Sequence, residues 1–250
     1  KGKEGHHTLT AEANANALKM FDAAIEADPE NAQAYAWKAC TLGQAMVRGY
    51  VDKPLEEIMP EFSNLMASAL SIDPNDFECH RLQCAVNTMM GDMKAALSHG
   101  KKAYDVNPND PRILQQYGEV LLKTGKTEEG CDLTLLALEY DPIAQGQTNS
   151  DKRKSDGVFG CVLDDRPDVG LEIASGMIDR SEKVLVYSAA LAVGSSGSLE
   201  SFSWLINDLK KADFGQIEEA IEEMGKFDVV VQSKLKEVFL DHILPLKEAA

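Results

Sequence analysis

Long apolar runs are missing from this 250-residue sequence, and none approaches the roughly 18 uncharged residues that a membrane-spanning helix needs. The first thirty residues also lack the basic stretch followed by an apolar stretch that marks a secretion signal. Both absences argue against membrane insertion and export. Because 44% of the residues are nevertheless apolar, we expect a soluble protein with a hydrophobic core of its own.

Positive charge is scarce as well. The sequence holds 25 Lys and Arg against 41 Asp and Glu, which gives a formal net charge of −16. A polyanion would meet net repulsion from such a chain and would lose the favourable release of counterions. We therefore exclude nucleic acid as a partner.

Cysteines are few and odd in number: Cys40, Cys79, Cys84, Cys131 and Cys161. Four of the five fall inside apolar patterns with helical spacing, and an odd number cannot pair completely. The cysteines therefore indicate reduced thiols in a cytoplasmic protein rather than a disulfide framework.

A turn motif recurs at a regular interval. Pro74 in SIDPND, Pro108 in DVNPNDP and Pro142 in EYDPIA are 34 residues apart, and Pro29 in EADPENA precedes Pro74 by 45. A period of 34 indicates a repeat of paired helices. Proline disfavours a helical conformation in the residue before it and is tolerated at a helix start, so each motif predicts a bend between two helices.

Amphipathic segments flank each bend. Ala96, Gly100 and Ala103 share one face of the segment before DVNPNDP, where small side chains let a neighbouring helix approach closely. Two of the segments that follow the bends end in Gly91 and Gly125, which predict helix ends in the left-handed conformation. The pattern as a whole predicts successive helical hairpins.

These features resemble the tetratricopeptide repeat family. Counting back from Pro108 and Pro142, the family's small or turn positions fall on Cys84 and Gly118, Gly91 and Gly125, Ala96 and Gly130, and Ala103 and Ala137. The sequence departs from the family pattern at His80 and Leu114, where an aromatic is expected, and at Gly100 and Thr134, where a large residue is expected. The resemblance implies an all-α fold, a right-handed superhelical α-solenoid of helical hairpins.

The first fifty residues carry a narrower resemblance. KGKEGHHTLT and the following AEANANALKMFDAAIEADPENAQAYAWKA are similar to the opening of the repeat region that follows the catalytic domain in bacterial class III adenylate or guanylate cyclases, and the likeness continues to about residue 144. The catalytic domain of such a protein would precede Lys1, and the sequence begins without Met. The resemblance implies that the chain is the regulatory C-terminal arm of a longer signalling protein and is not itself an enzyme.

The domain organisation follows from these patterns. Residues 1–144 are predicted to form the repeat array, an N-terminal helix plus about three hairpins closed by the prolines at 29, 74, 108 and 142. The polar run QGQTNSDKRKS at 145–155 breaks the rhythm and is predicted to be a loop or joint. Residues 156–250 are predicted to form degenerate hairpins and a C-terminal cap with a polar outer face.

No motif indicates catalysis, a metal or a cofactor. Cys79, His80 and Cys84 lie together in CHRLQC, but zinc needs four ligands and no second Cys or His pair lies nearby. Adjacent His6 and His7 would point about 100° apart on a helix and could not easily share one ion. The GSSGS stretch lacks the lysine of a phosphate-binding loop. We predict no catalytic residue, no cofactor and no metal site.

The tetratricopeptide resemblance also predicts a binding groove, because the first helix of each hairpin lines the concave side in that family. Trp37 beside Leu82 and Met89 would supply an apolar anchor with a hydrogen-bonding rim. In the alternative, Trp37 and Met89 pack between hairpins. The predicted groove residues are Trp37, Gln44, Arg81, Leu82, Met89, Arg112, Gln115, Gln116, Glu119 and Lys123.

Two classes of function follow. The favoured one is a protein-interaction scaffold, which binds a peptide, a partner domain or another copy of the chain in its groove. The other is a ligand-sensing module that holds a small molecule in the groove or at the 145–155 joint. A scaffold should leave an open groove with an exposed apolar patch, whereas a sensor should enclose a pocket of a few hundred Å³ with convergent polar groups.

Overall fold

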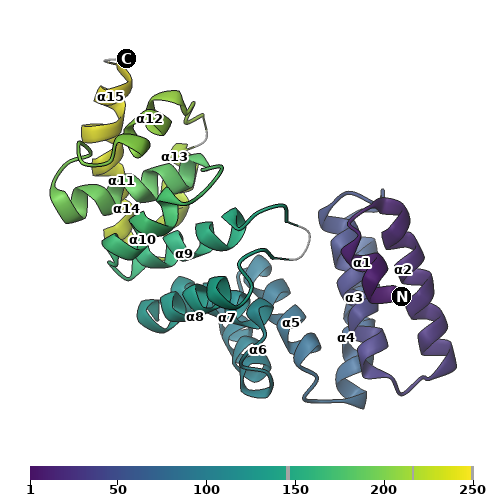
Figure 1. Cartoon of the computed structure of the whole chain (residues 1–250). Helices are drawn as coiled ribbons and strands as arrows, with labels where there is room; N and C mark the ends of the chain where they lie inside the picture. The colour runs from purple at the N-terminus through teal and green to yellow at the C-terminus, as the bar shows by residue number, and fades with distance from the viewer. Residues whose placement is uncertain (145–146, 216, 249–250) are drawn as a thin grey trace. The chain divides into compact units, whose positions relative to one another are not determined.

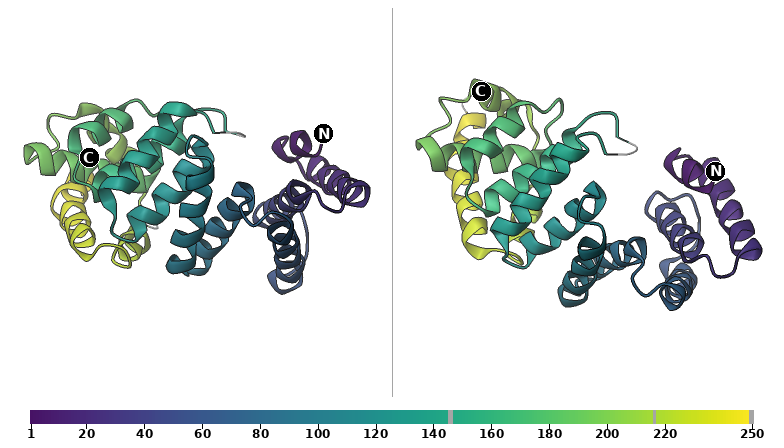
Figure 2. Two further views of the ribbon diagram at one scale, coloured as in Figure 1. Left: turned by 90° about the horizontal axis from the view of Figure 1, so that it is seen from below. Right: turned by 60° about the horizontal axis from the view of Figure 1, so that its bottom comes forward.

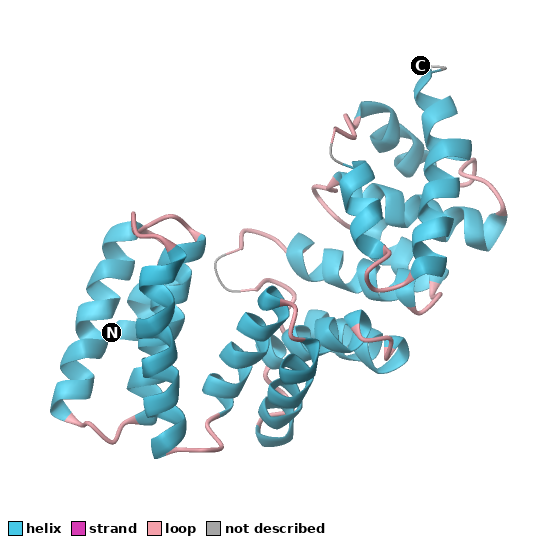
Figure 3. Ribbon diagram, turned by 180° about the vertical axis from the view of Figure 1, so that it is seen from behind, coloured by secondary structure: helices cyan, strands magenta, loops and turns pink. Residues whose placement is uncertain are grey.

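The structure, a computed structural model, describes residues 1–144, 147–215 and 217–248, and every regular element in these ranges is helical (Figures 1 and 3). The side chain of Leu55 lies outside the description. The chain divides into two compact units, Lys1–Asn109 and Asp110–Ala250. The all-α architecture of successive hairpins confirms the predicted fold class.

The first unit is built from hairpins of neighbouring helices. The helices α2, α3 and α4 lie side by side, α1 packs on α2, and α5 pairs with α6 (Figure 1). The alternation of buried alanines with larger apolar residues on α3 allows it to contact both α2 and α4 closely. The helices of this unit are α1 (Gly2–His7), α2 (Ala11–Ala27), α3 (Ala32–Val47), α4 (Leu55–Ile72), α5 (Phe77–Met90) and α6 (Met93–Val106).

All four predicted bends are confirmed and share one local structure. The residue before each proline ends a helix and donates its backbone N–H to an alanine carbonyl four residues earlier: Asp28 to Ala24, Asp73 to Ala69, Asn107 to Ala103 and Asp141 to Ala137. Asp28 and Asp73 are in the extended conformation. The extended conformation is the one that a following proline favours. After the first three bends a side chain caps the next helix, from Asn31, Asp76 and Asp110.

The predicted glycine helix ends are also confirmed. Gly91 and Gly125 have φ angles of 79° and 81°, in the left-handed region where a Cβ atom would be strained. The loop 48–54 joins α3 to α4 and carries Tyr50. Its hydroxyl donates a hydrogen bond of 2.5 Å to the carbonyl of Leu9, just after α1, so this loop is tied to the N-terminal segment.

The second unit begins with the hairpin of α7 (Pro111–Lys123) and α8 (Thr127–Tyr140), followed by α9 (Asp151–Leu163) and α10 (Pro167–Ser175). Helix α9 starts within the predicted 145–155 joint, of which residues 145 and 146 lie outside the description. The guanidinium of Arg153 on α9 bonds to Gln115 and to the carbonyls of Pro111 and Asp141. These bonds join α9 to the α7/α8 hairpin, so the unit boundary lies at Asn109–Asp110, before the predicted joint.

The C-terminal half surrounds a single central helix. Residues of α11 are buried on almost every side, by α9, α10, α12, α13 and α14. Figure 2 shows the yellow C-terminal helices packed with the green helices of the same unit. A helix that is apolar all round is expected in such a core. These elements are α11 (Glu182–Ser196), α12 (Ser203–Lys211), α13 (Ile217–Met224), α14 (Val229–Val238), a π-helical turn (Phe239–Ile243) and α15 (Leu244–Glu248). The predicted terminal segments are therefore helical.

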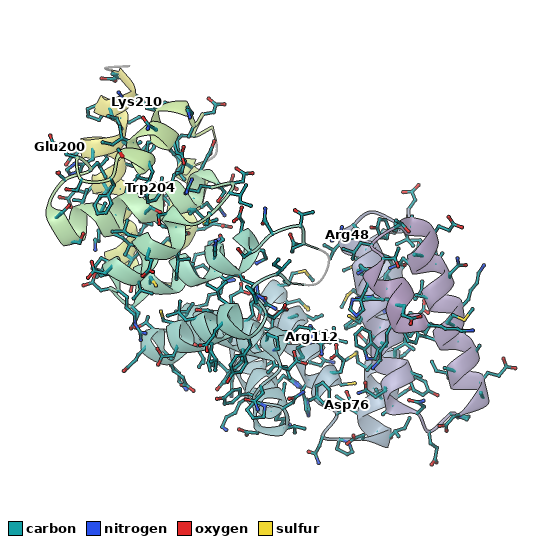
Figure 4. The ribbon with its side chains drawn as sticks, viewed as in Figure 1. Arg48, Asp76, Arg112, Glu200, Trp204 and Lys210 are labelled. Carbon is teal, nitrogen blue, oxygen red and sulfur yellow. The ribbon has the colours of Figure 1, made fainter. Side chains whose placement is uncertain are left out.

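Two local features stabilise this half. Arg180 stacks over the ring of Trp204, labelled in Figure 4, at 4.6 Å and donates to the carbonyl of Ala174 at the end of α10. The π-helical turn ends two residues before Pro245, which has no N–H to donate to the carbonyl of Asp241. The wider turn accommodates the missing hydrogen bond.

Candidate functional site

A cavity of about 330 Å³ opens between α3, α4 and α5 of the first unit. It is lined mainly by aliphatic, aromatic and methionine side chains, and Met89 and Val47 at its edge are 60% and 75% exposed. The cavity brings together three of the predicted groove residues, Gln44, Leu82 and Met89. The lining residues are His6, Cys40, Gly43, Gln44, Met46, Val47, Ile58, Met59, Phe62, Leu82, Ala85, Val86 and Met89.

A hydrogen-bonded network of polar side chains forms one end of this cavity. The hydroxyl of Thr41 donates to the carbonyl of Trp37 at 2.8 Å, so its oxygen accepts from Nδ1 of His6 at 3.1 Å. His6 is therefore protonated on Nδ1 and accepts on Nε2. Asn14 donates to Oε1 of Gln44 at 2.9 Å, which leaves the Gln44 amide nitrogen to donate to His6 Nε2 at 3.4 Å.

The side chains of this network are buried, which explains why their hydrogen bonds have fixed directions. His6 is 8% exposed, Asn14 is 2% exposed and Thr41 is fully buried. Buried polar groups cost free energy unless they are hydrogen-bonded, and here each bond assigns the direction of the next. Gln44 and His6 are consequently held in fixed orientations at the cavity wall, together with the thiol of Cys40, 3.8 Å from His6 Nε2.

Trp37 is buried rather than exposed in the groove. Its ring is 4% exposed, and α1 covers it with His6 and His7 at 5.5 Å between ring centroids and the Lys3 ammonium at 4.6 Å. Its indole N–H donates to Gln33 at 3.2 Å. Trp37 is therefore not an exposed anchor, and it does not pack between successive hairpins either, because the N-terminal helix covers its ring and Phe21 of α2 packs beside it.

Arg81 forms a buried ion pair. Its guanidinium bonds to Glu78, which is fully buried, and lies 3.7 Å from the Cys40 sulfur. Burial by itself would lower the pKa of Arg81, but the adjacent Glu78 carboxylate outweighs it and the pKa is raised. Arg81 therefore supports the wall behind Cys40 and stays ionised.

The predicted groove residues of the second unit lie on α7 and contact their own unit. Arg112 pairs with Asp110 at 2.6 Å, and Glu119 pairs with Lys123 at 2.5 Å. Gln116 is half-buried. Gln115 accepts from Arg153 and donates to Asp156, whose pKa is raised mainly by burial. Whether any of these residues binds a partner stays a prediction.

The buried His80 and the half-buried His99 form a second polar pair in the first unit. Their Nδ1 atoms lie 3.0 Å apart, and Nε2 of His80 donates to the carbonyl of Pro74 at 3.0 Å. Burial lowers the pKa of both imidazoles, and the nearby Lys102 ammonium lowers both further. Two nitrogens do not complete a metal site, and among the described residues no cluster of three or more His, Cys, Asp or Glu side chains could hold a metal ion.

Sequence reasoning missed the contribution of two elements to the cavity. Ile58, Met59 and Phe62 come from the second helix of the first hairpin, and His6 comes from α1. The amphipathic pattern of α4 is visible in the sequence, but it indicates a buried face without saying which neighbours share it. No local signal places His6 against α3, because that contact depends on how α1 folds back. No helix in the described ranges is long and apolar enough to cross a membrane.

The similarity of this chain to known proteins is a similarity of fold. No protein-family model matches the sequence, and no curated protein matches it. Among solved structures, a tetratricopeptide repeat protein from Parabacteroides merdae aligns with a TM-score of 0.50 and 14% identity, covering 95% of this chain and 96% of that one. Yeast Tom70 aligns with a TM-score of 0.36 and 11% identity, covering 96% of this chain and 63% of that one. The chain therefore has a fold similar to that of a tetratricopeptide repeat protein.

Proposed function

We propose that this chain is a non-catalytic protein-interaction module that binds an extended or helical peptide along α3 and α5 of its first unit. The observation that carries the proposal is the cavity at Gln44, Leu82 and Met89, with exposed apolar side chains at its edge. A partner peptide could place one apolar side chain in the cavity and lay its neighbours along the exposed methionines. Methionine adapts its shape to different partners, which suits such a surface.

A peptide library displayed on phage and selected against the whole chain tests this proposal. We expect the selected peptides to share an apolar anchor residue, and we expect the isolated peptide to bind the chain in a fluorescence anisotropy titration. Met89→Glu should weaken that binding by about tenfold or more, because it places a charge at the cavity edge. Met20→Glu is the matched control, since Met20 is 48% exposed on α2 and does not line the cavity.

Equal losses with the two variants, or no enriched peptide, would contradict the proposed site. A peptide that binds with undiminished affinity to Met89→Glu would show that the partner uses another surface. Sedimentation velocity of the unmodified chain distinguishes binding of a separate peptide from self-association through the same residues.

We further propose that the module is the C-terminal arm of a cyclase-like signalling protein. The support is the amino-acid sequence of residues 1–144, from KGKEGHHTLT onward, which resembles the cyclase repeat region more specifically than the 34-residue repeat pattern alone does. Sequencing the gene upstream of the Lys1 codon tests this proposal. A nucleotide-cyclase catalytic domain encoded there would support it, and an initiation codon directly before Lys1 would contradict it.

One observation favours a second candidate function, that of a ligand-sensing module. The cavity is not a plain apolar patch, because His6, Cys40 and Gln44 converge at one end of it. A few fixed polar groups in an otherwise apolar pocket are typical of small-molecule sites.

A further inference from the structure

We propose that the cavity between α3, α4 and α5 binds a small neutral amphiphile: an uncharged molecule with an apolar body of about ten non-hydrogen atoms and one hydroxyl or carbonyl head group that bonds to Gln44. This inference rests on the second candidate function, ligand sensing, and names the ligand class for it. It is independent of the cyclase proposal.

The size of the ligand follows from the cavity volume. A volume of about 330 Å³ corresponds to roughly eleven times the space of one water molecule in the liquid. A methylene group takes up nearly the same space as a water molecule, so about ten non-hydrogen atoms fill the cavity. The volume is at the lower end of the range of about 300–1,000 Å³ for ligand pockets, which excludes a large cofactor.

The neutrality of the ligand follows from the wall. Of the lining side chains that the structure describes, none belongs to Asp, Glu, Lys or Arg. The guanidinium of Arg81, 3.7 Å from the sulfur of the lining residue Cys40, is already neutralised by its ion pair with Glu78. A charged ligand would lose its hydration here without gaining a counter-charge, and that loss is costly. An uncharged ligand avoids this penalty.

The head group follows from the directions of the hydrogen bonds. Oε1 of Gln44 accepts from Asn14, and one N–H of its amide faces His6 Nε2. An amide nitrogen carries two N–H groups, so the second can donate to an oxygen of the ligand. A hydroxyl or carbonyl oxygen meets this requirement, whereas an alkane does not. The lining residues Met46, Met59 and Met89 provide adaptable apolar surface for the body.

The placement of His6 gives the site a way to report occupancy. His6 belongs to α1, whereas the other lining residues belong to α3, α4 and α5. Gly2 and Gly5 allow α1 to lie directly against Phe21 and Ala17 of α2. A ligand held by Gln44 beside His6 therefore contacts both α1 and the helices α3, α4 and α5. Its binding should favour the conformation in which α1 packs against α2.

Methyl NMR of the whole chain labelled at its methionine methyl groups tests the proposal with octanol as the probe. We expect octanol to shift the signals of Met46, Met59 and Met89 and to leave those of Met177 and Met224, in the second unit, unchanged. Octanoate and octylammonium, matched in length but charged, should bind at least about tenfold more weakly.

Two variants locate the site. Ala85→Phe should fill the cavity and abolish the octanol shifts, while Ala23→Phe, on an exposed position of α2, should not. Gln44→Leu should weaken octanol binding by about fivefold through the lost hydrogen bond. Unchanged circular dichroism and an unchanged signal of Met93, which lies on α6 of the first unit and does not line the cavity, show that each variant is folded.

The outcomes separate the two functions. Octanol that leaves all three cavity methionines unshifted, charged probes that bind as tightly as octanol, or octanol shifts that survive Ala85→Phe would each overturn the proposal. If octanol does not bind while a selected peptide does, the ligand proposal is wrong and the proposal of a protein-interaction module is supported. If octanol binds and no peptide is found, the proposal of a protein-interaction module is wrong and the ligand proposal is supported.

Discussion

Replacing Gly130 by alanine would place a methyl group where α7 and α8 approach most closely. A Cβ atom at this position would lie 2.8 Å from the Gly118 carbonyl oxygen, the Leu122 backbone nitrogen and Leu122 Cγ. Two of these three atoms belong to the backbone of α7, so the new methyl cannot be accommodated by a side-chain rotation. The matched control is Gly157→Ala in α9, where the nearest atoms are the ends of leucine and isoleucine side chains at 3.4 Å or more.

The magnitude follows from two opposing effects. Alanine is favoured over glycine in a helix interior by about 1 kcal/mol, and this gain applies at both positions. At Gly130 the contact is more than half an ångström shorter than the roughly 3.5 Å of an optimal contact, and overpacking of this kind costs about 1–3 kcal/mol. Because backbone atoms must move, we expect the upper end of that cost. Gly130→Ala should therefore lower the free energy of unfolding by about 2 kcal/mol, while Gly157→Ala should raise it by up to about 1 kcal/mol.

Urea denaturation followed by far-ultraviolet circular dichroism measures both changes. The two glycines lie in the same compact unit, so they report on the same unfolding transition. A Gly130→Ala protein as stable as the unmodified chain would refute the reasoning, because it would mean that α7 and α8 separate at no cost. Destabilisation by Gly157→Ala to the same extent would also refute it, since the effect would then not depend on the helix approach.

Three further predictions follow from buried polar groups. The pKa values of His80 and His99 are lowered, so at acidic pH the folded chain binds fewer protons than the unfolded chain. The stability that these histidines contribute is complete above the unfolded pKa of about 6.5 and is lost as the pH falls through the lower folded values. Urea titrations from pH 7.5 to 5 should show this loss of stability, and His99→Gln should make the loss smaller. Arg153→Ala should destabilise the second unit by about 3 kcal/mol, because the buried Arg153 guanidinium is the donor to Gln115, to the half-buried Asp141 carboxylate and to the Pro111 carbonyl. Arg166→Ala, which removes the ion pairs of a half-buried guanidinium with Asp132 and Asp164, should cost no more than about 1 kcal/mol, and equal losses would count against the network around Arg153. Maleimide should label Cys40 first in the native chain and the four buried cysteines only after unfolding, as peptide mass mapping would show.

The local features of the repeat could be predicted because the residues that cause them are adjacent in sequence. A proline acts on the residue before it, and a left-handed helix end needs only a glycine at that position, so the bends at Pro74 and Pro108 and the helix ends at Gly91 and Gly125 follow from short stretches. The 34-residue period then determined that these stretches recur as hairpins.

The binding surface could be predicted only in part. Gln44, Leu82 and Met89 lie at the cavity because their positions in the first helices of two successive hairpins follow from the repeat. The same reasoning placed Trp37 in an open groove, where it would anchor a partner. Helix α1 covers it instead, and no rule of local spacing describes how a helix of six residues folds back on the array.

By itself the sequence determined the class of fold, the bends between helices and the close approach of their small-residue faces, since all of these depend on conformational preferences within one repeat. Only the tertiary structure decided that His6 meets Gln44 at one end of a cavity, that α11 becomes the centre of the second unit, and that α9 joins α7 through Arg153. The contacts of His6 with Gln44 and of Arg153 with Pro111 join residues 38 and 42 positions apart, and α11 is enclosed by helices from both sides of it in the sequence. Such contacts form where complementary surfaces meet after the helices have packed.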